Sequence, residues 1–345
     1  MRADITESIA NSYNQPAGPS WLDKRYSIWQ EFTKMNANGL ESSSSEDDDD
    51  DGIAKEDVKE GIQGYTQYKN YAIAWGSPLC DKARWGTVAR KFIHFCQSNG
   101  WVCVWTCVEK DFEVVLSEAD LNWSSLSCIR QDMVDLSTVN LTRSRDVRNN
   151  VRRSNKAGIT VSEALEVTDS DKAQVEQGIH DWKKKRTGLQ IATQDLQPWV
   201  DLKHRRIFYA RESETGKIWG FTILAKISSN CQQIEHSTVF PNAPRGVSEH
   251  LLHDVLESLH AQGVLYCSFG VSAADKLIPT HNLSSVRMAW LSKMYNSIVS
   301  ATGLTNRGAF REKFDVEHQP LYVCYPKGKF GSEALGALMK SVHTK

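Results

Sequence analysis

The chain has 345 residues, of which 40% are apolar, with 11 Trp, 10 Tyr and 11 Phe, so a largely disordered protein is excluded and two folded lobes can be built. The formal net charge is −1, but residues 41–60 hold ten acids and two bases, which leaves 39 bases and 32 acids elsewhere. This basic remainder suits an anionic partner without requiring one. Because no apolar run is long enough for a signal peptide or a membrane span, we expect a cytoplasmic protein.

The first 64 residues predict a helix followed by an acidic segment. From Ser20, the run SWLDKRYSIWQEFTKM places Trp21 and Trp29 in an amphipathic helical pattern. We expect this helix to dock on the protein's own core, with a membrane surface or a partner protein as the alternative. The run ESSSSEDDDDDGIAKEDVKE at 41–60 cannot bury apolar area and is expected to be disordered.

Regular elements are predicted from residue 71 onwards. The patterns predict strands at 71–75, 101–108 and 112–116 and a helix at 82–98. Cys103 and Cys107 are expected on the same face of the second strand. The eight cysteines are scattered without the spacing of a zinc site, so we interpret them as reduced core thiols.

A short basic helix is predicted in RSRDVRNNVRRSNKAGITV at 143–161, with Ser144 as its N-cap and Gly158 as its C-cap. Helical spacing gathers most of its cations into one stripe, and planar guanidinium groups bind phosphate oxygens in pairs. The cations expected to contact phosphates are Arg145, Arg148, Arg152, Arg153 and Lys156. The alternative is a solvated helix whose arginines pair with acids elsewhere in the fold.

The second half repeats the mixture of strands and helices. Helices are predicted at 169–186, 248–262 and 284–302, and strands at 206–211, 217–226, 232–239, 264–271 and 320–325. Both halves combine antiparallel hairpins with crossing helices, which predicts an α+β protein made of two related lobes. The first helix ends in the basic run WKKKR, which adds Lys183, Lys184 and Lys185 to the candidate phosphate contacts, although lysines at a helix end are often only solvated.

Four segments occur in an order that resembles a known family: SPLC at 77–80, the basic helix, PNAPRGVSEHLL at 241–252 and FREKFDVEHQPLYVCYP at 310–326. They resemble the catalytic domain of phosphatidylglycerol lysyltransferases and are similar to fungal relatives that esterify ergosterol with an amino acid. The resemblance implies tandem acetyltransferase-like (GNAT) lobes with mixed sheets flanked by helices. It places these lobes at 65–165 and 166–345, after an N-terminal segment 1–64, with a tunnel between them.

The activity that the resemblance implies is an aminoacyl transfer. The amino acid, glycine first and aspartate second, would move from aminoacyl-tRNA to a lipid hydroxyl, the 3β-hydroxyl of ergosterol. The implied partners are the aminoacyl-tRNA, the lipid or sterol in a membrane touched peripherally, and an aminoacyl-tRNA synthetase. The alternatives are aminoacylation of phosphatidylglycerol, a CoA-dependent or peptide-forming acyl transfer on the same fold, and an RNA-binding module without activity.

The candidate catalytic residues lie in two segments. In FREKF, Arg311 and Lys313 are expected to hold the tRNA 3′ end or the developing oxyanion, and a strand at 310–314 would place both on one face. In CQQIEHSTVF, Glu235 is a candidate amino-group anchor or base and His236 a candidate base. Because residues alternate along a strand, only one of this second pair is expected to face the tunnel.

No bound metal or CoA cofactor is expected. The turn before the helix at 248–262 has a single glycine, Gly246, and the proline at 244 lacks an amide donor, which disfavours a CoA pyrophosphate there. His250 and His253 lack a third ligand at zinc spacing, so a metal site is rejected. Glu249 is expected to complement the dipole of that helix, and 203–206 (KHRR) could extend the phosphate contacts.

Overall fold

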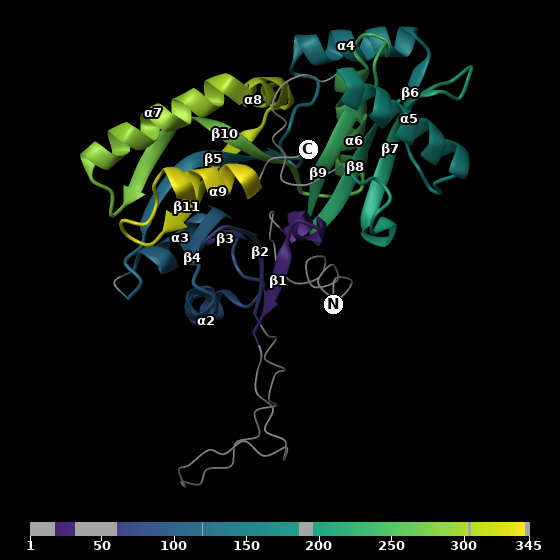
Figure 1. Cartoon of the computed structure of the whole chain (residues 1–345). Coiled ribbons are helices and arrows are strands. Elements are labelled where there is room, and N and C mark those ends of the chain that lie inside the picture. The colour runs from purple at the N-terminus through teal and green to yellow at the C-terminus, as the bar shows by residue number, and fades with distance from the viewer. Residues whose placement is uncertain (1–17, 32–60, 119, 186–195, 303–304, 342–345) are drawn as a thin grey trace, which may run out of the picture.

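The computed structural model describes residues 18–31, 61–118, 120–185, 196–302 and 305–341. The strands form one mixed sheet in the order β1-β2-β3-β4-β11-β5-β10-β9-β8-β7-β6 (Figure 1). The strands are β1 Ser27–Gln30, β2 Ile62–Tyr68, β3 Tyr71–Trp75, β4 Val102–Val108, β5 Ser124–Asp135, β6 Ile159–Glu163, β7 Arg205–Glu212, β8 Ile218–Ser228, β9 Cys231–Val239, β10 Tyr266–His281 and β11 Glu317–Tyr325.

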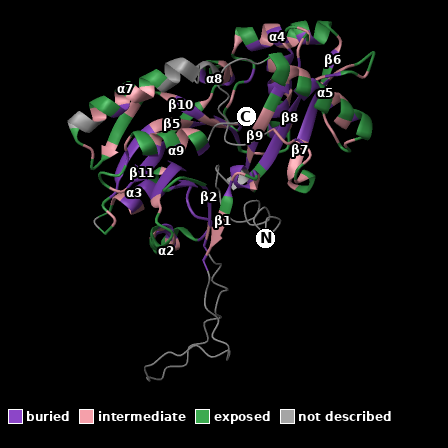
Figure 2. Cartoon of the chain, in the orientation of Figure 1, coloured by how far each residue is buried: buried purple, intermediate pink, exposed green. Residues whose placement is uncertain are grey.

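Helices cover the sheet. The α-helices are α2 Trp85–Ser98, α3 Lys110–Ser117, α4 Arg145–Lys156, α5 Asp169–Lys185, α6 Val247–Ala261, α7 Ser285–Thr302, α8 Thr305–Arg311 and α9 Ser332–Ser341. Short 3₁₀ turns are η1 Gly18–Leu22, η2 Lys82–Arg84, η3 Leu202–His204 and η4 Glu312–Phe314. Figure 2 shows the buried residues along the strands and the exposed residues on the outer sides of the helices.

The sheet divides into two lobes that meet at β5, β10 and β11. In Figure 1, β1 to β4 lie with α2 and α3 in one lobe, and β6 to β9 lie with α4, α5 and α6 in the other. The arrangement confirms the predicted α+β fold, with two lobes and a mixed sheet flanked by helices. The lobe boundary at residue 165 stays a prediction. Some elements lie on the other side of it: α4 and β6 precede residue 165 but pack in the second lobe, whereas β11 follows it but pairs with β4 and β5.

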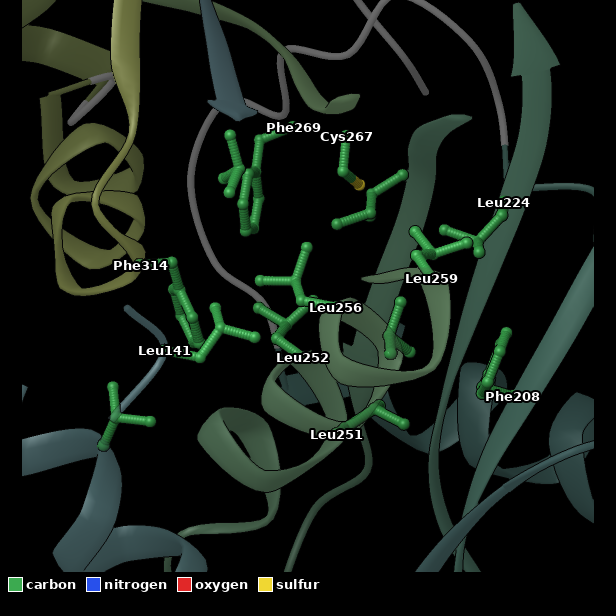
Figure 3. Packing of buried hydrophobic residues seen from close by; sticks show 14 of the residues in the cluster. Leu141, Phe208, Leu224, Leu251, Leu252, Leu256, Leu259, Cys267, Phe269 and Phe314 are labelled. Atoms are coloured by element: carbon green, nitrogen blue, oxygen red, sulfur yellow. The ribbon is translucent and has the colours of Figure 1, made fainter. Parts of the chain in front are cut away.

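The second lobe has an apolar core on each face of its strands. One core joins α6 to β8, β9 and β10 and includes Leu252, Leu256, Phe269 and Phe314. Figure 3 shows Phe314 next to Leu141 and beside Leu252 and Leu256 of α6, and its ring centroid lies 5.7 Å from that of Phe269. The other core joins α5 to β7 and β8. Helices α4 and α5 therefore cover opposite faces of this lobe.

The predicted N-terminal helix is wrong. The segment forms the turn η1 and the strand β1, because its aromatic residues are held by contacts distant in sequence. The Trp21 indole is buried and donates a hydrogen bond to the Trp75 carbonyl at 2.9 Å, and a Cβ on Gly64 would lie only 2.4 Å from that ring. The expectation that the segment docks on the protein's own core is confirmed. The acidic run 41–60 lies outside the described residues.

Two further predictions for the first lobe are wrong. The strand expected at 112–116 is the helix α3, in which Phe112 and Leu116 are buried one turn apart. Cys103 and Cys107 join different apolar clusters, because the left-handed backbone of Cys107 (φ 58°) breaks the alternation of β4. All eight cysteines are free thiols, and burial raises the pKa of Cys80, for example, to about 12.

A glycine substitution tests the contact between α4 and α6. Gly246 has φ +94°, and a Cβ on it would lie 2.2 Å from the Asn150 backbone oxygen of α4. Left-handed strain and steric overlap together predict that Gly246→Ala lowers the unfolding free energy by about 2–4 kcal/mol.

The matched control is Gly263→Ala, since Gly263 has φ +77° and open space around its Cβ position. Only the strain of about 1–2 kcal/mol applies there. Chemical denaturation of both variants measures the difference, and equal losses would contradict the steric contact with α4.

Candidate functional site

Helix α4 presents the basic stripe to solvent. The Ser144 side chain accepts a hydrogen bond from the Val147 amide, which confirms the predicted N-cap, and Gly158 follows the helix in a left-handed conformation. Its inward residues are Val147, Asn150 and Ser154. The outward cations Arg145, Arg152, Arg153 and Lys156 are exposed, and Arg148 is half-buried.

The cations of α4 differ in how they are held. The Arg148 guanidinium donates to the Arg143 carbonyl at 3.0 Å, and Arg153 donates to the Asn150 side chain at 3.1 Å. Within the described ranges, Arg145, Arg152 and Lys156 have no carboxylate partner. The alternative of a helix whose cations pair internally therefore does not apply to these three residues.

The lysine run lies at the end of α5, on the other face of the second lobe. Lys183, Lys184 and Lys185 are exposed, and Lys185 donates to the Asn242 side chain at 3.1 Å. Asn242 belongs to the loop before α6, whose last residue, Gly246, packs on α4. This loop therefore contacts both basic elements, the end of α5 and α4. Arg186 lies outside the described residues.

Of the basic residues at 203–206, three contact carboxylates of the fold and Lys203 is exposed, and an extension of the stripe by this run stays a prediction. Arg206 forms two hydrogen bonds of 2.6 Å with Glu163, and His204 contacts Asp201 at 2.8 Å. The nearly buried Arg205 side chain pairs with Glu235 at 2.6 Å. Internal carboxylates occupy these side chains.

Glu235 and His236 lie on β9, and the expected alternation fails there. The pairing of β8 with β9 steps from Ile223↔His236 to Leu224↔Ile234, so Glu235 is the extra residue of a β-bulge. Its carboxylate is fully buried in the ion pair with Arg205. The opposite charge comes from β7, the strand that begins with Arg205.

Arg311 and Lys313 lie together, but not on a strand. Helix α8 ends at Arg311, η4 follows, and Asp315 ends the turn with φ 57°. We call residues 311–315 the junction segment. Because the 3₁₀ turn points successive side chains in different directions, Arg311 and Lys313 do not share a face as predicted.

The first half of the junction segment contacts a buried carboxylate, Asp132 of β5, which is 0% exposed. The Arg311 guanidinium donates to Asp132 Oδ2 at 2.8 Å, and His318 Nδ1 lies 2.8 Å from Oδ1. Ser272 donates to the same Oδ1 at 3.1 Å. His318 Nε2 faces Glu312 Oε1 at 2.6 Å. We call Asp132, Ser272, Arg311, Glu312 and His318, together with Arg130, the Asp132 cluster.

The second half of the junction segment contacts the basic helix α4. Lys313 Nζ lies 2.6 Å from Asp146 in the first turn of α4 and 2.8 Å from the buried Glu249 of α6. Arg143, just before α4, pairs with Asp315 at 3.1 Å. Lys313 therefore holds α4 and α6 together beside the Asp132 cluster.

Burial and charge shift the pKa values of both candidate cations. Burial lowers the pKa of Arg311, against the opposing effect of Asp132. Burial alone would lower the pKa of Lys313, but its hydrogen bonds with Asp146 and Glu249 outweigh this and raise the pKa. Lys313 is therefore a fixed positive charge at neutral pH rather than a proton acceptor.

The sequence did not predict Asp132 and His318 as site residues. They face each other in the pairing of β5 with β11, His318↔Asp132. A buried carboxylate that orients an imidazole is suited to proton transfer, and the neighbouring guanidinium groups are suited to stabilise an oxyanion. Only the polar pattern of IRQD in a strand could have drawn attention to Asp132.

The histidines of α6 have structural partners. His250 lies between Ser154 and Asp254, with Nδ1 at 2.9 Å from the hydroxyl and Nε2 at 3.0 Å from the carboxylate, and His253 Nδ1 lies 2.9 Å from Asp254. No group of three or more metal-ligating side chains occurs in the part of the chain that the structure describes.

Comparison with known families gives a match to the family model described as phosphatidylglycerol lysyltransferase, C-terminal, over residues 55–325. Comparison with curated proteins gives no significant match.

Solved structures share the fold. The C-terminal domain of a putative lysylphosphatidylglycerol synthetase from Agrobacterium fabrum matches with a TM-score of 0.71 and 16% identity, covering 98% of this chain and 96% of that one. L-PGS from Bacillus licheniformis matches with a TM-score of 0.67 and 16% identity, covering 83% and 87%. FemX matches with a TM-score of 0.51 and 9% identity, covering 84% and 89%.

Asp254→Asn tests the structural role of the α6 histidines. Burial would raise the pKa of Asp254, but hydrogen bonds from His250 and His253 outweigh this and hold it at about 2. The hydrogen bond with Asp254 raises the pKa of His253. The ion pair thus stabilises the fold above the ordinary Asp pKa and below the raised His253 pKa.

We therefore expect Asp254→Asn to lower the melting temperature most at about pH 5, and progressively less as the pH rises through the raised His253 pKa and the imidazolium is lost. Glu257→Gln is the control, since Glu257 lies 3.9 Å from His253 Nε2 and should matter less. A loss that does not change with pH would contradict the ion pair.

Proposed function

The chain belongs to the phosphatidylglycerol lysyltransferase C-terminal family and is an aminoacyltransferase, and we propose that it transfers an amino acid from aminoacyl-tRNA to a lipid hydroxyl. The reaction is an ester exchange in which the acceptor oxygen attacks the aminoacyl carbonyl and the ribose oxygen leaves. Since the aminoacyl ester is already activated, no ATP is required. The enzyme has to position both substrates, stabilise an oxyanion and move one proton.

The observation that supports this proposal most strongly is the junction segment. Its Lys313 contacts the helix that presents exposed arginines, and its Arg311 contacts the buried Asp132 cluster. A transferase that uses tRNA needs phosphate contacts and a reaction centre at a fixed separation. One short turn provides both connections here.

For the tRNA, we propose that α4 binds backbone phosphates near the acceptor end through Arg145, Arg148, Arg152, Arg153 and Lys156, with Lys183, Lys184 and Lys185 as a second set. Such contacts position a nucleic acid without reading its sequence. In the reaction, Arg311 is the proposed oxyanion contact, while Lys313 positions α4. Glu235 and His236 remain candidates for the amino-group anchor and the base.

For the acceptor, we propose the 3β-hydroxyl of ergosterol, with phosphatidylglycerol as the alternative, and glycine before aspartate as the amino acid. The support is the resemblance of the four segments to the fungal relatives. No described helix is long and apolar enough to cross a membrane, so the proposed meeting with the lipid is a peripheral contact. The tRNA would be charged by a separate synthetase.

The geometry at α6 supports a donor other than acetyl-CoA. A CoA pyrophosphate in related folds requires free amides at a helix N-terminus. Here Gly246 packs on the Asn150 backbone, and Glu249 places a carboxylate in the first turn. Because Lys313 pairs with this carboxylate, the close packing at Gly246 is the feature that disfavours a pyrophosphate.

A transfer assay tests the function. The purified chain is incubated with tRNA charged with labelled glycine or aspartate, and with vesicles that contain ergosterol or phosphatidylglycerol. We expect label in the sterol fraction, verified by mass spectrometry. Label that never enters a lipid while acetyl-CoA is consumed would contradict the proposal.

The variant Lys313→Ala, compared with the wild-type protein, distinguishes an enzyme from an RNA-binding module without activity. The enzyme predicts a loss of transfer that exceeds the loss of tRNA affinity, because Lys313 contacts α4 and α6 rather than solvent-facing phosphates. The binding module predicts no transfer by the wild-type protein.

Charge removal on α4 tests the RNA contact. Arg145→Ala with Arg152→Ala is expected to weaken tRNA binding and to reduce the slope of log affinity against log salt by about 1–2. The control is Arg90→Ala on α2 of the other lobe, an exposed arginine whose nearest carboxylate, Asp120, is 3.5 Å away. If Arg90→Ala has the same effect per charge as the α4 double variant, the binding depends on net charge alone and the proposed contact with α4 is contradicted.

A further inference from the structure

We propose that His318 is the proton relay of the transfer, that Asp132 orients it, and that Glu312 occupies its reactive nitrogen until a substrate hydroxyl replaces that carboxylate. This inference rests on the proposed function and names a base for it. It adds to Glu235 and His236 a third candidate, one that lies in contact with the junction segment.

The orientation of the imidazole is fixed from the buried side. Asp132 is 0% exposed, and its Oδ1 lies 2.8 Å from His318 Nδ1. The strand pairing places the two residues directly opposite each other, so the contact follows from the register of β5 and β11. A carboxylate on Nδ1 keeps that nitrogen protonated and leaves Nε2 as the atom that can accept a proton.

The reactive nitrogen faces a group that can move. Glu312 Oε1 lies 2.6 Å from His318 Nε2, and the Glu312 side chain is 50% exposed on the turn η4. Its other contact is Arg130, at 3.5 Å. A half-exposed carboxylate held this loosely can swing into solvent, whereas the fully buried Asp132 cannot.

The charges around His318 come from four elements. Asp132 and Arg130 lie on β5, Arg311 ends α8, Glu312 lies on η4, and Asp275 of β10 is 3.7 Å from Arg130. The two guanidinium groups oppose the three carboxylates. Because Glu312 is the carboxylate at Nε2, its removal acts on that nitrogen more directly than any distant change.

In the proposed step, one proton moves from the acceptor hydroxyl to the ribose oxygen through His318. His318 Nε2 takes the proton of the acceptor hydroxyl as that oxygen bonds to the aminoacyl carbonyl carbon. When the tetrahedral intermediate collapses, the bond between this carbon and the ribose oxygen breaks, and Nε2 returns the proton to the ribose oxygen. No oxidant, reductant or further reactant is needed.

Two variants of the full chain test the relay in the lipid-transfer assay. His318→Gln is expected to lower kcat by about 10²-fold or more, with tRNA affinity unchanged. Glu312→Gln is expected to lower the KM for the lipid acceptor with little change in kcat, because a neutral amide competes less than the carboxylate with the acceptor hydroxyl for Nε2. A purely structural role would not lower this KM.

The matched control is His281→Gln. His281 Nδ1 also lies on a fully buried carboxylate, Glu113, at 2.6 Å, but in the first lobe outside the Asp132 cluster. We expect this variant to retain wild-type kcat, and melting temperatures identify any variant that fails to fold.

The outcomes separate the two proposals. If the wild-type chain esterifies no lipid with any aminoacyl-tRNA, the proposed function fails. If the wild-type chain is active and folded His318→Gln keeps its kcat within about threefold, the relay is overturned while the function stands. An unchanged KM for the acceptor in Glu312→Gln overturns the role of Glu312 at Nε2.

Discussion

The buried carboxylate of Asp132 is the constraint around which the two lobes meet. A fully buried charge is tolerated only where charged and polar partners surround it. Those partners come from β10, α8 and β11, which are 140, 179 and 186 residues away in the sequence. Loss of a single partner of a buried ion pair typically costs about 3–5 kcal/mol, so the partners of this carboxylate help to hold β5, β10, α8 and β11 together and give the cluster its fixed geometry.

The junction segment connects the Asp132 cluster to the basic helix α4 at the protein surface. A strand at 311–315 would direct alternate side chains to two faces only, whereas a 3₁₀ turn spreads them around its axis. Arg311 thereby reaches the Asp132 carboxylate, Phe314 enters the apolar core of the second lobe, and Lys313 reaches α4 and α6. The Asp132 cluster, the apolar core of the second lobe and α4 are connected within five residues, so a displacement of one would displace the others.

Local patterns predicted the elements whose cause is local. The stripe and caps of α4, the leucines of α6 and the hairpin of β7 and β8 were all predicted from spacing and turn residues. The wrong predictions share a distant cause. Trp21 is held by the Trp75 carbonyl rather than by a helix, and Glu235 is paired with an arginine from another strand. The contact of His318 with Asp132 depends on the register of β11, which enters the sheet between β4 and β5, and no short window of sequence contains that information.

The charges at the base of α4 explain how one side of a helix can remain available to phosphates. Asp146 in its first turn and Glu249 below it would weaken the field of the stripe if they stood alone. Lys313 contacts both carboxylates, and Arg245 further lowers the pKa of Asp146, so these acids are compensated from within the fold. Arg145, Arg152 and Lys156 then face solvent as cations without described carboxylate partners. In the proposed transferase, Lys313 therefore supports tRNA binding electrostatically from a position where it need not touch the RNA.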